Sequence, residues 1–307
     1  MKKTFLLIAS VAIAAMFAIV ACEKEPTTTD TPTDTTETPG TTDTIVPPVE
    51  IPELTVRTDV QNRNVVIEEY TGVSCGYCPN GHAVVRVLME QNPNRIFGIN
   101  IHQGYYTTWK DGETYFTTSY GTPLASQTGL TGYPAATINR HVFSGSTMAT
   151  SNTSEWQANS RTVMSESSCV NLAAQCVMDK ESREMAIQVK GYYTSNSNTA
   201  TNKLNVALLQ NDVIGPQANY GNYNPSQYDS HGNYHHMHML RKLLSGTWGV
   251  DMNATSAGST FDTTFTYTLP DKIGNVQCVP EDMEIIVFMA EGRTNIITGT
   301  KAEIYIR

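Results

Sequence analysis

The sequence predicts an α/β part followed by an all-β part. Two patterns lead to this prediction. Between residues 65 and 102, two apolar strand-like runs flank a segment whose apolar residues recur with helical spacing, as in a β-α-β unit. After residue 168, β-rich segments alternate in places between apolar and polar residues and are separated by Gly, Asn, Ser and Asp. That second pattern indicates an antiparallel β-sandwich, of the immunoglobulin-like kind.

Within the α/β part, the first strand is expected at Val65–Tyr70 and the second at Arg95–His102. The helix between them is expected at His82–Gln91, where its apolar residues share one face. A polar and aromatic segment, 103–130, precedes a further extended run, and 154–165 is expected to close this part as a helix. The β-rich segments of the second part lie at 169–178, 185–193, 204–210, 261–269, 283–290 and 296–306.

The N-terminal residues 1–21 have the pattern of a secretory signal peptide. Lys2 and Lys3 are followed by an apolar run, Phe5–Val20, which is short for a membrane span. The run ends in Ile-Val-Ala-Cys22, which resembles the lipobox of bacterial lipoproteins. The resemblance implies cleavage before Cys22 and attachment of a diacylglycerol and an N-linked acyl chain such as palmitate, which would make the membrane a partner. The alternative is an ordinary signal peptide followed by a coincidental cysteine.

Residues 22–51 consist mainly of Thr, Pro and acidic residues after Cys22, and they show no apolar periodicity. Such a segment buries too little surface to fold, so a disordered stalk is predicted. Loss of the two signal-peptide lysines changes the formal net charge from −9 to −11. With no basic stripe, nucleic acid is not expected as a partner. No cofactor is predicted either.

A Cys-x-x-Cys pair, Cys75-Gly-Tyr-Cys78, follows the first predicted strand directly and stands where a helix is expected to start. A helix N-terminus favours a thiolate and lowers the pKa of a nearby thiol. Cys75 is therefore the expected nucleophile of a redox pair, and Cys78 its resolving partner. A permanent structural bridge and a zinc site are the alternatives, and the zinc site is disfavoured because no second Cys-x-x-Cys exists.

The strand, the cysteine pair, the helix, the second strand and then Gly-Tyr-Pro134 together resemble the thioredoxin superfamily. The resemblance implies that Pro134 is a cis-proline packed against the disulfide. It also implies that Glu69, six residues before Cys75, is a buried acid that accepts the proton of the resolving cysteine. The predicted domains are then a thioredoxin-like domain at 52–166 and a β-sandwich domain at 167–307.

Over most of the chain after residue 21, the sequence is similar to the outer-membrane-protein-28 family. The matching segments are Glu68–Gly72, Cys78-Pro79, Gly132–Arg140 and Tyr234–Arg241. Membership implies a lipid-anchored envelope protein of the bacterial outer membrane, on its periplasmic or surface-exposed face, with a thioredoxin-like domain and a β-rich C-terminal domain. The family resemblance implies a fold more firmly than an activity.

Three further cysteines lie in the β-rich part. Cys169 and Cys176 are separated by an odd number of residues, so on a regular strand they face opposite sides. A disulfide between Cys176 and Cys278 is favoured in an oxidising compartment, and three free thiols are the alternative.

A histidine-rich segment includes His231, His235, His236 and His238. The last two share one face of a strand, which allows a metal site. A structural role is favoured, because no third ligand is fixed by the spacing.

Two functions remain open at this stage. The first is a thiol–disulfide oxidoreductase or isomerase acting on envelope proteins through Cys75 and Cys78. The second is a non-enzymatic surface binding or adhesion protein that uses the thioredoxin fold as a scaffold. Its contact surface would be the β-rich part and an aromatic insertion comprising Tyr105, Tyr106, Trp109, Tyr115, Phe116 and Tyr120.

Lipidation is directly testable. Cys22→Ser should leave the protein unprocessed or soluble, because the acylated thiol is the predicted anchor. Cell fractionation and labelling with a radioactive fatty acid measure this, with Cys169→Ser as the control that should fractionate like the wild type. A normally cleaved, membrane-anchored Cys22→Ser protein would contradict the prediction.

Overall fold

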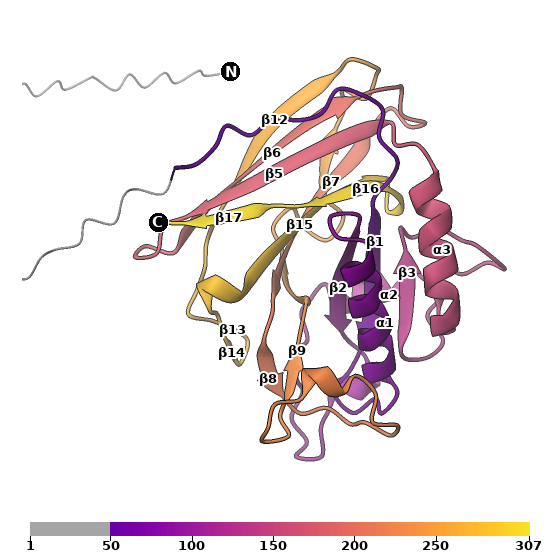
Figure 1. Ribbon diagram of the computed structural model, residues 1–307, viewed down its shortest axis with the longest axis vertical. Coiled ribbons are helices and arrows are strands. Elements are labelled where there is room, and N and C mark those ends of the chain that lie inside the picture. Colours follow the sequence, from indigo (N-terminus) through magenta and orange to yellow (C-terminus); the bar gives the residue numbers. More distant parts are fainter. Residues whose placement is uncertain (1–49) are drawn as a thin grey trace, which may run out of the picture. The chain divides into compact units, whose positions relative to one another are not determined.

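The computed structural model describes residues 50–307 (Figure 1). The predicted signal peptide, Cys22 and the stalk up to residue 49 lie outside the described residues. The described part is dominated by β-strands, with three α-helices confined to its first half. Within this part of the chain, no helix is long and apolar enough to span a membrane.

The first half contains the expected strand–helix–strand unit. Its elements are β1 (Val65–Thr71), α1 (Cys78–Gln91), β2 (Ile96–His102), η1 (Tyr105–Thr107), α2 (Gly121–Ser126), β3 (Ala135–Ile138), β4 (Ala149–Thr150) and α3 (Thr153–Ser165). Strand β1 pairs in parallel with β2 and antiparallel with β3. Every residue of β1 is buried, because helices cover both faces of the sheet here. Helix α1 begins four residues earlier than its apolar spacing predicts.

The second half is built almost entirely from strands. They are β5 (Val170–Met178), β6 (Glu184–Tyr193), β7 (Asn202–Gln210), β8 (Val213–Gly215), β9 (Tyr234–His236), β10 (Met239–Leu243), β11 (Val250–Met252), β12 (Thr260–Thr268), β13 (Lys272–Ile273), β14 (Val276–Gln277), β15 (Met283–Glu291), β16 (Thr294–Lys301) and β17 (Glu303–Ile306). Two short 3₁₀ turns, η2 (Pro225–Gln227) and η3 (Pro280–Asp282), interrupt them. The expectation of a β-rich second half is confirmed.

Strands from the two halves belong to one large sheet. Its order is β16-β15-β7-β10-β2-β1-β3-β4, with β11 paired to β7. Strand β10 joins β2 in parallel through a single register pair, Met239 opposite Asn100. A second sheet, β12-β6-β5-β17, packs over the β7 and β15 region (Figure 1). The predicted division near residue 166 and the sandwich description stay predictions, and the hydrogen-bonded sheet runs across that position.

Three hydrophobic clusters form the core. The largest lies between the two sheets and includes Ile187, Val206 and Val287. A second lies on the α2 side of the large sheet, and a third lies under α1 and α3 around Ile67 and Trp156. Fully burying one large apolar side chain stabilises a fold by about 1.5–3 kcal/mol, so these clusters dominate its stability.

The favoured Cys176–Cys278 disulfide is wrong, since both residues are free thiols in the structure. Cys176 lies in the middle of β5, opposite Ile187 of β6, and Cys278 lies in the segment after β14, where its amide bonds to the Asp271 carbonyl. Both side chains contribute to the same apolar core without meeting as a pair. Burial raises the pKa of Cys176 to about 12, so this thiol is chemically inert. Cys169 is also free and half-buried.

A buried ion pair ties β1 to the chain segment after β3. Arg140 donates to both carboxylate oxygens of Glu68, at 2.8 and 2.5 Å, and both side chains are almost fully buried. Arg140 also donates to the carbonyl of Arg293, and the adjacent Asn139 donates to the carbonyl of Ile296. These bonds connect the first half to β16.

Removing one partner of this pair should strongly destabilise the fold. Arg140→Ala leaves the Glu68 carboxylate buried without a cation, and such a change costs about 3–5 kcal/mol. Urea unfolding followed by circular dichroism measures the loss. The matched control is Arg57→Ala, which breaks the exposed Arg57–Asp59 pair and should leave the urea midpoint unchanged. Equal midpoints for the two variants would contradict the role of the buried pair.

Candidate redox site

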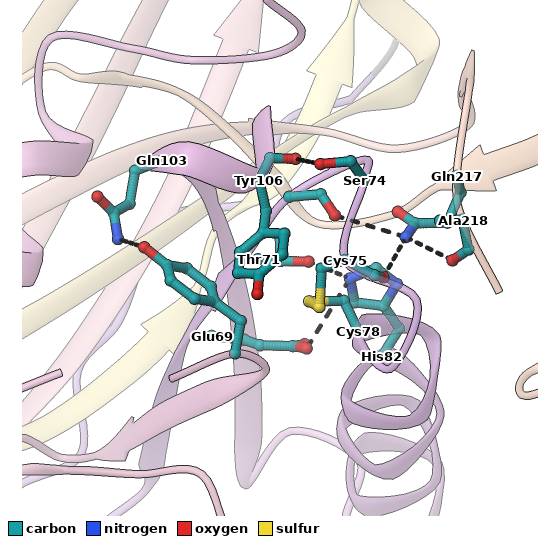
Figure 2. The surroundings of a disulfide bond; sticks show 12 residues. Glu69, Thr71, Ser74, Cys75, Cys78, His82, Gln103, Tyr106, Gln217 and Ala218 are labelled. Atoms are coloured by element: carbon teal, nitrogen blue, oxygen red, sulfur yellow. Dashed lines mark hydrogen bonds and ion pairs between the residues drawn. A yellow bond between two sulfur atoms is a disulfide. The ribbon is translucent and has the colours of Figure 1, made fainter. Parts of the chain in front are cut away.

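Cys75 and Cys78 form a disulfide at the point where β1 leads into α1 (Figure 2). Cys75 lies in the turn before the helix, and its amide donates to the carbonyl of Gly72. Cys78 is the first residue of α1, followed by Pro79, which the first helical turn tolerates because amides there need no helical partner. Cys75 is 3% exposed and Cys78 is fully buried.

A segment from the second half lies across this turn. We call residues 216–223, in the loop after β8, the strap. Its backbone amides at Ala218 and Tyr220 donate to the carbonyls of Val73 and Gly76, at 2.7 and 2.9 Å. Gln217 donates through Nε2 to the carbonyl of Cys75 at 3.0 Å (Figure 2). The strap therefore lies along the backbone of this turn, from Val73 to Gly76.

Gly76 allows this close approach. A side chain at position 76 would collide with the ring of Tyr220. On the other side of the turn, Ser74 donates through both its amide and its hydroxyl to the carbonyl of Tyr106. The turn is thus held by the strap and by η1, two segments that both follow it in the sequence.

Glu69 lies behind the disulfide on the helix side of β1. Neighbouring residues of a strand point to opposite faces, so Glu68 meets Arg140 while Glu69 points toward α1. Glu69 is 0% exposed, and neither carboxylate oxygen has a hydrogen-bond partner among residues 50–307. Burial raises its pKa well above the ordinary value. We call the turn at residues 72–78, which contains Cys75 and Cys78, the redox turn. A buried carboxylate without a hydrogen-bond partner beside this turn is the feature expected of a proton acceptor.

Gly81 brings α1 against Glu69 and Pro134. A Cβ at position 81 would meet the Oε1 atom of Glu69 and lie 2.8 Å from Cβ of Pro134. The Tyr133–Pro134 peptide bond is cis. Of the residues that sequence reasoning selected, Cys75 and Cys78 are joined at the start of α1, and Glu69 and Pro134 both lie against Gly81 of that helix, three residues after Cys78. Their catalytic roles stay predictions.

His82 and Tyr234 are part of the site that sequence reasoning missed. His82 lies one turn into α1, with Nε2 at 2.8 Å from the Thr71 hydroxyl and 3.8 Å from Oε1 of Glu69. Its Nδ1 lies 2.7 Å from the hydroxyl of Tyr234 on β9. Burial lowers the pKa of His82 to about 3, so the ring is neutral at neutral pH. In the sequence, only the position of His82 four residues after Cys78 indicates that it belongs to the site, and this spacing is a weak signal.

The histidine-rich segment has separate partners for each ring. His235 bonds to Asp212 at 2.5 Å, and His238 bonds to Glu284 at 2.6 Å. His236 is buried against His102, with ring centroids 5.2 Å apart, while His231 is exposed. Among the described residues, no group of three His, Cys, Asp or Glu side chains is placed to hold a metal ion.

The aromatic insertion divides into buried and exposed members. Phe116 packs on His102 and His236, and Tyr120 packs against the core of the large sheet. Tyr105 is 87% exposed beside the redox turn. Tyr77 of the turn and Tyr220 of the strap are also exposed and pack edge to face, with centroids 5.5 Å apart.

The sequence profile described as outer membrane protein Omp28 matches residues 122–304, which is more than half of the chain. Among curated protein sequences, none matches this chain significantly.

Solved structures give more distant likenesses. HBP35 of Porphyromonas gingivalis is 18% identical with a TM-score of 0.61, covering 80% of this chain and 76% of that chain. At this identity the likeness shows a shared fold alone. A protein of Agrobacterium tumefaciens is 12% identical with a TM-score of 0.47, covering 79% and 95% of the respective chains. A domain of the outer membrane lipoprotein Omp28 from P. gingivalis is 16% identical with a TM-score of 0.30, covering 46% and 91%. The last two TM-scores are too low to carry an argument.

The close approach at Gly81 is testable by adding one methyl group. In Gly81→Ala the new Cβ must displace Glu69 or Pro134, and overpacking of this kind costs about 1–3 kcal/mol. This exceeds the roughly 1 kcal/mol that Ala gains over Gly in a helix. We therefore expect a lower free energy of unfolding, measured by urea denaturation. Gly132→Ala is the control, since nothing lies within 4 Å of its Cβ position. A Gly81→Ala protein more stable than the wild type would show that α1 has space for a methyl group at this point.

Proposed function

Because this chain belongs to the outer membrane protein Omp28 family, it is an outer-membrane protein of the cell envelope, and we propose that it exchanges thiols and disulfides with envelope proteins there. In this proposal Cys22 carries the lipid anchor, residues 22–51 form the stalk, and residues 52–166 form a thioredoxin-like domain. The observation that carries it is the disulfide at the first turn of α1, a helix that packs at Gly81 against both buried Glu69 and cis-Pro134.

Further support for the thioredoxin-like part comes from the order and direction of its elements. Parallel β1 and β2 are joined by α1, and β3, which begins directly after Pro134, runs antiparallel to β1. The cysteine pair lies at the carboxyl end of β1. A ligand or substrate site is commonly found at this end of strands in α/β sheets.

The chemistry follows from the two sulfur atoms and Glu69. In the oxidative half-reaction, a mixed disulfide joins Cys75 to a partner protein, and the Cys78 thiol gives its proton to Glu69. The Cys78 thiolate then attacks the Cys75 sulfur, the Cys75–Cys78 bond forms, and the partner leaves as a thiolate. The same steps in reverse order reduce the Cys75–Cys78 disulfide and oxidise two partner thiols.

Access to Cys75 requires the strap to move. Cys75 is 3% exposed, and the strap holds the turn through hydrogen bonds of Gln217, Ala218 and Tyr220 and through packing of the Tyr220 ring on Gly76 and Tyr77. Each such bond contributes only about 0.5–1.5 kcal/mol, so local displacement is energetically accessible. A partner polypeptide can replace these bonds with its own backbone.

A second candidate function is supported by a different observation. Tyr77, Tyr105 and Tyr220 are exposed around a disulfide that is itself covered, which suits a non-enzymatic surface binding protein with an aromatic contact surface. In that case the disulfide holds the turn, and the exposed tyrosines make the contacts.

An insulin-reduction assay on the full chain tests the proposal. The wild type should accelerate insulin precipitation by dithiothreitol, and Cys75→Ser should lose the effect, because the attacking sulfur is gone. Cys78→Ser should trap mixed disulfides with envelope proteins, which mass spectrometry would identify. Cys169→Ser is the matched control, since it removes a half-buried thiol outside the site. Wild-type activity in Cys75→Ser, or no activity in the wild type, would favour the binding-protein function instead.

A further inference from the structure

His82 lies between Glu69 and a cavity of about 400 Å³. The cavity is lined by residues of α1 and of the chain around β9, including His82, Tyr234 and Asn224. Glu69 does not line it. His82 thus both lies 3.8 Å from the Glu69 carboxylate and lines this cavity.

The buried position of Glu69 creates a need for such a link. A proton taken from Cys78 in each oxidative turnover must leave Glu69 before the next turnover. The carboxylate is 0% exposed and has no hydrogen-bond partner among the described residues. Its burial, with Gly81 of α1 packed against it, therefore prevents direct transfer to bulk water.

We propose that His82 and Tyr234 pass this proton from Glu69 to water in the cavity. The inference rests on the proposed function and deepens it. His82 acts through Glu69 and is therefore a positioning residue rather than one that touches the reacting sulfurs.

Each transfer conserves protons. With its own hydrogen on Nδ1, the neutral ring of His82 donates to Tyr234, and its Nε2 accepts from the Thr71 hydroxyl until it exchanges that partner for Glu69. The 3.8 Å separation closes to a hydrogen bond by a movement of about 1 Å. Protonated Glu69 gives its hydrogen to Nε2 as the Nδ1 hydrogen moves to the Tyr234 oxygen and the phenolic hydrogen moves to water, which becomes hydronium. The ring is left with its hydrogen on Nε2 and must return to the Nδ1-protonated form before it accepts the next proton. Asn224 also donates to this oxygen at 3.2 Å, which leaves the phenolic hydrogen to point elsewhere.

The surroundings of His82 favour a neutral ring. Glu69 and Thr71 face it from β1, and Tyr234 faces it from β9. His236 is a further titratable neighbour, with ring centroids 6.4 Å apart. The charged and titratable groups on the cavity wall are Arg86, Glu90 and His238. Burial lowers the pKa of both His82 and His236 to about 3, so neither ring holds a lasting charge at neutral pH.

The test is the rate of the resolving step in the full chain. Reduced protein is mixed with oxidised glutathione, samples are quenched in acid, and the Cys75–glutathione adduct and the Cys75–Cys78 disulfide are separated by mass spectrometry. His82→Phe and Tyr234→Phe should slow resolution of the adduct by at least about 10-fold, since positioned proton transfer contributes at least that much. Alkylation of Cys75 by iodoacetamide should stay within about 2-fold of the wild type, because His82 acts only on the later step.

Two readouts separate proton transfer from a structural effect. In a Glu69→Gln background, His82→Phe should produce no further loss, because the relay has no proton to receive. In His82→Ala, added imidazole should restore resolution in proportion to its concentration. The matched control is His102→Phe, which also replaces a buried histidine, one that does not contact Glu69. It should resolve the adduct at the wild-type rate.

The outcomes distinguish failure of the proposed function from failure of the relay alone. If wild-type Cys75 forms no glutathione adduct, the proposed function and the relay both fail. If the adduct forms and both His82→Phe and Tyr234→Phe resolve it at the wild-type rate, the relay alone fails. If His82→Phe does not fold, Tyr234→Phe decides, because it removes one hydroxyl and keeps the ring. Additive losses in the Glu69→Gln background would also overturn the relay.

Discussion

The junction between β2 and β10 determines where the second half of the chain meets the redox turn. It is small: the amide of Asn100 donates to the carbonyl of His238, and the Asn100 side chain donates to the carbonyl of Met237. Strand β10 pairs with β2 at this junction and with β7 on its other side, which joins it to the rest of the large sheet. Because 211–238 is held at both ends by that sheet, the strap and Tyr234 reach the cysteine pair from a distance of about 140 residues along the chain.

Two adjacent glutamates on β1 have different environments in this fold. Glu68 faces the side on which Arg140 returns after β3 and is neutralised there. Glu69 faces α1, where Gly81 leaves just enough room, and among residues 50–307 no Lys or Arg forms an ion pair with it. One side chain forms a buried ion pair with Arg140, whereas burial raises the pKa of the other. Because neighbouring side chains of β1 point to opposite faces of the sheet, one glutamate has a structural role and the next is suited to accept a proton.

The sequence predicted the local part of this site well. The apolar run of β1, the Cys-x-x-Cys spacing, the start of a helix and the second strand are all encoded within a stretch of about forty residues. The strap could not be predicted, because its Asn- and Tyr-rich composition indicates only a loop, and its bonds to Val73, Cys75 and Gly76 are formed across the fold. His82 was missed for the same reason, since its partner Tyr234 belongs to β9. The Cys176–Cys278 prediction was wrong because alternation gives the face of a residue but not its neighbour across a core.

The way the described chain enters the fold has a mechanical consequence. Before reaching β1, residues 57–61 are bonded to the start of β5, where Asn171 donates to the carbonyls of Arg57 and Asp59 and the amide of Ser168 donates to Gln61. In Figure 1 the described chain starts beside the C-terminus and β17, whereas β8 and β9 lie at the opposite end. Tension arriving from the N-terminal side would therefore be borne first by the smaller sheet. The cysteine pair, which the strap after β8 contacts, lies away from the point where the described chain begins.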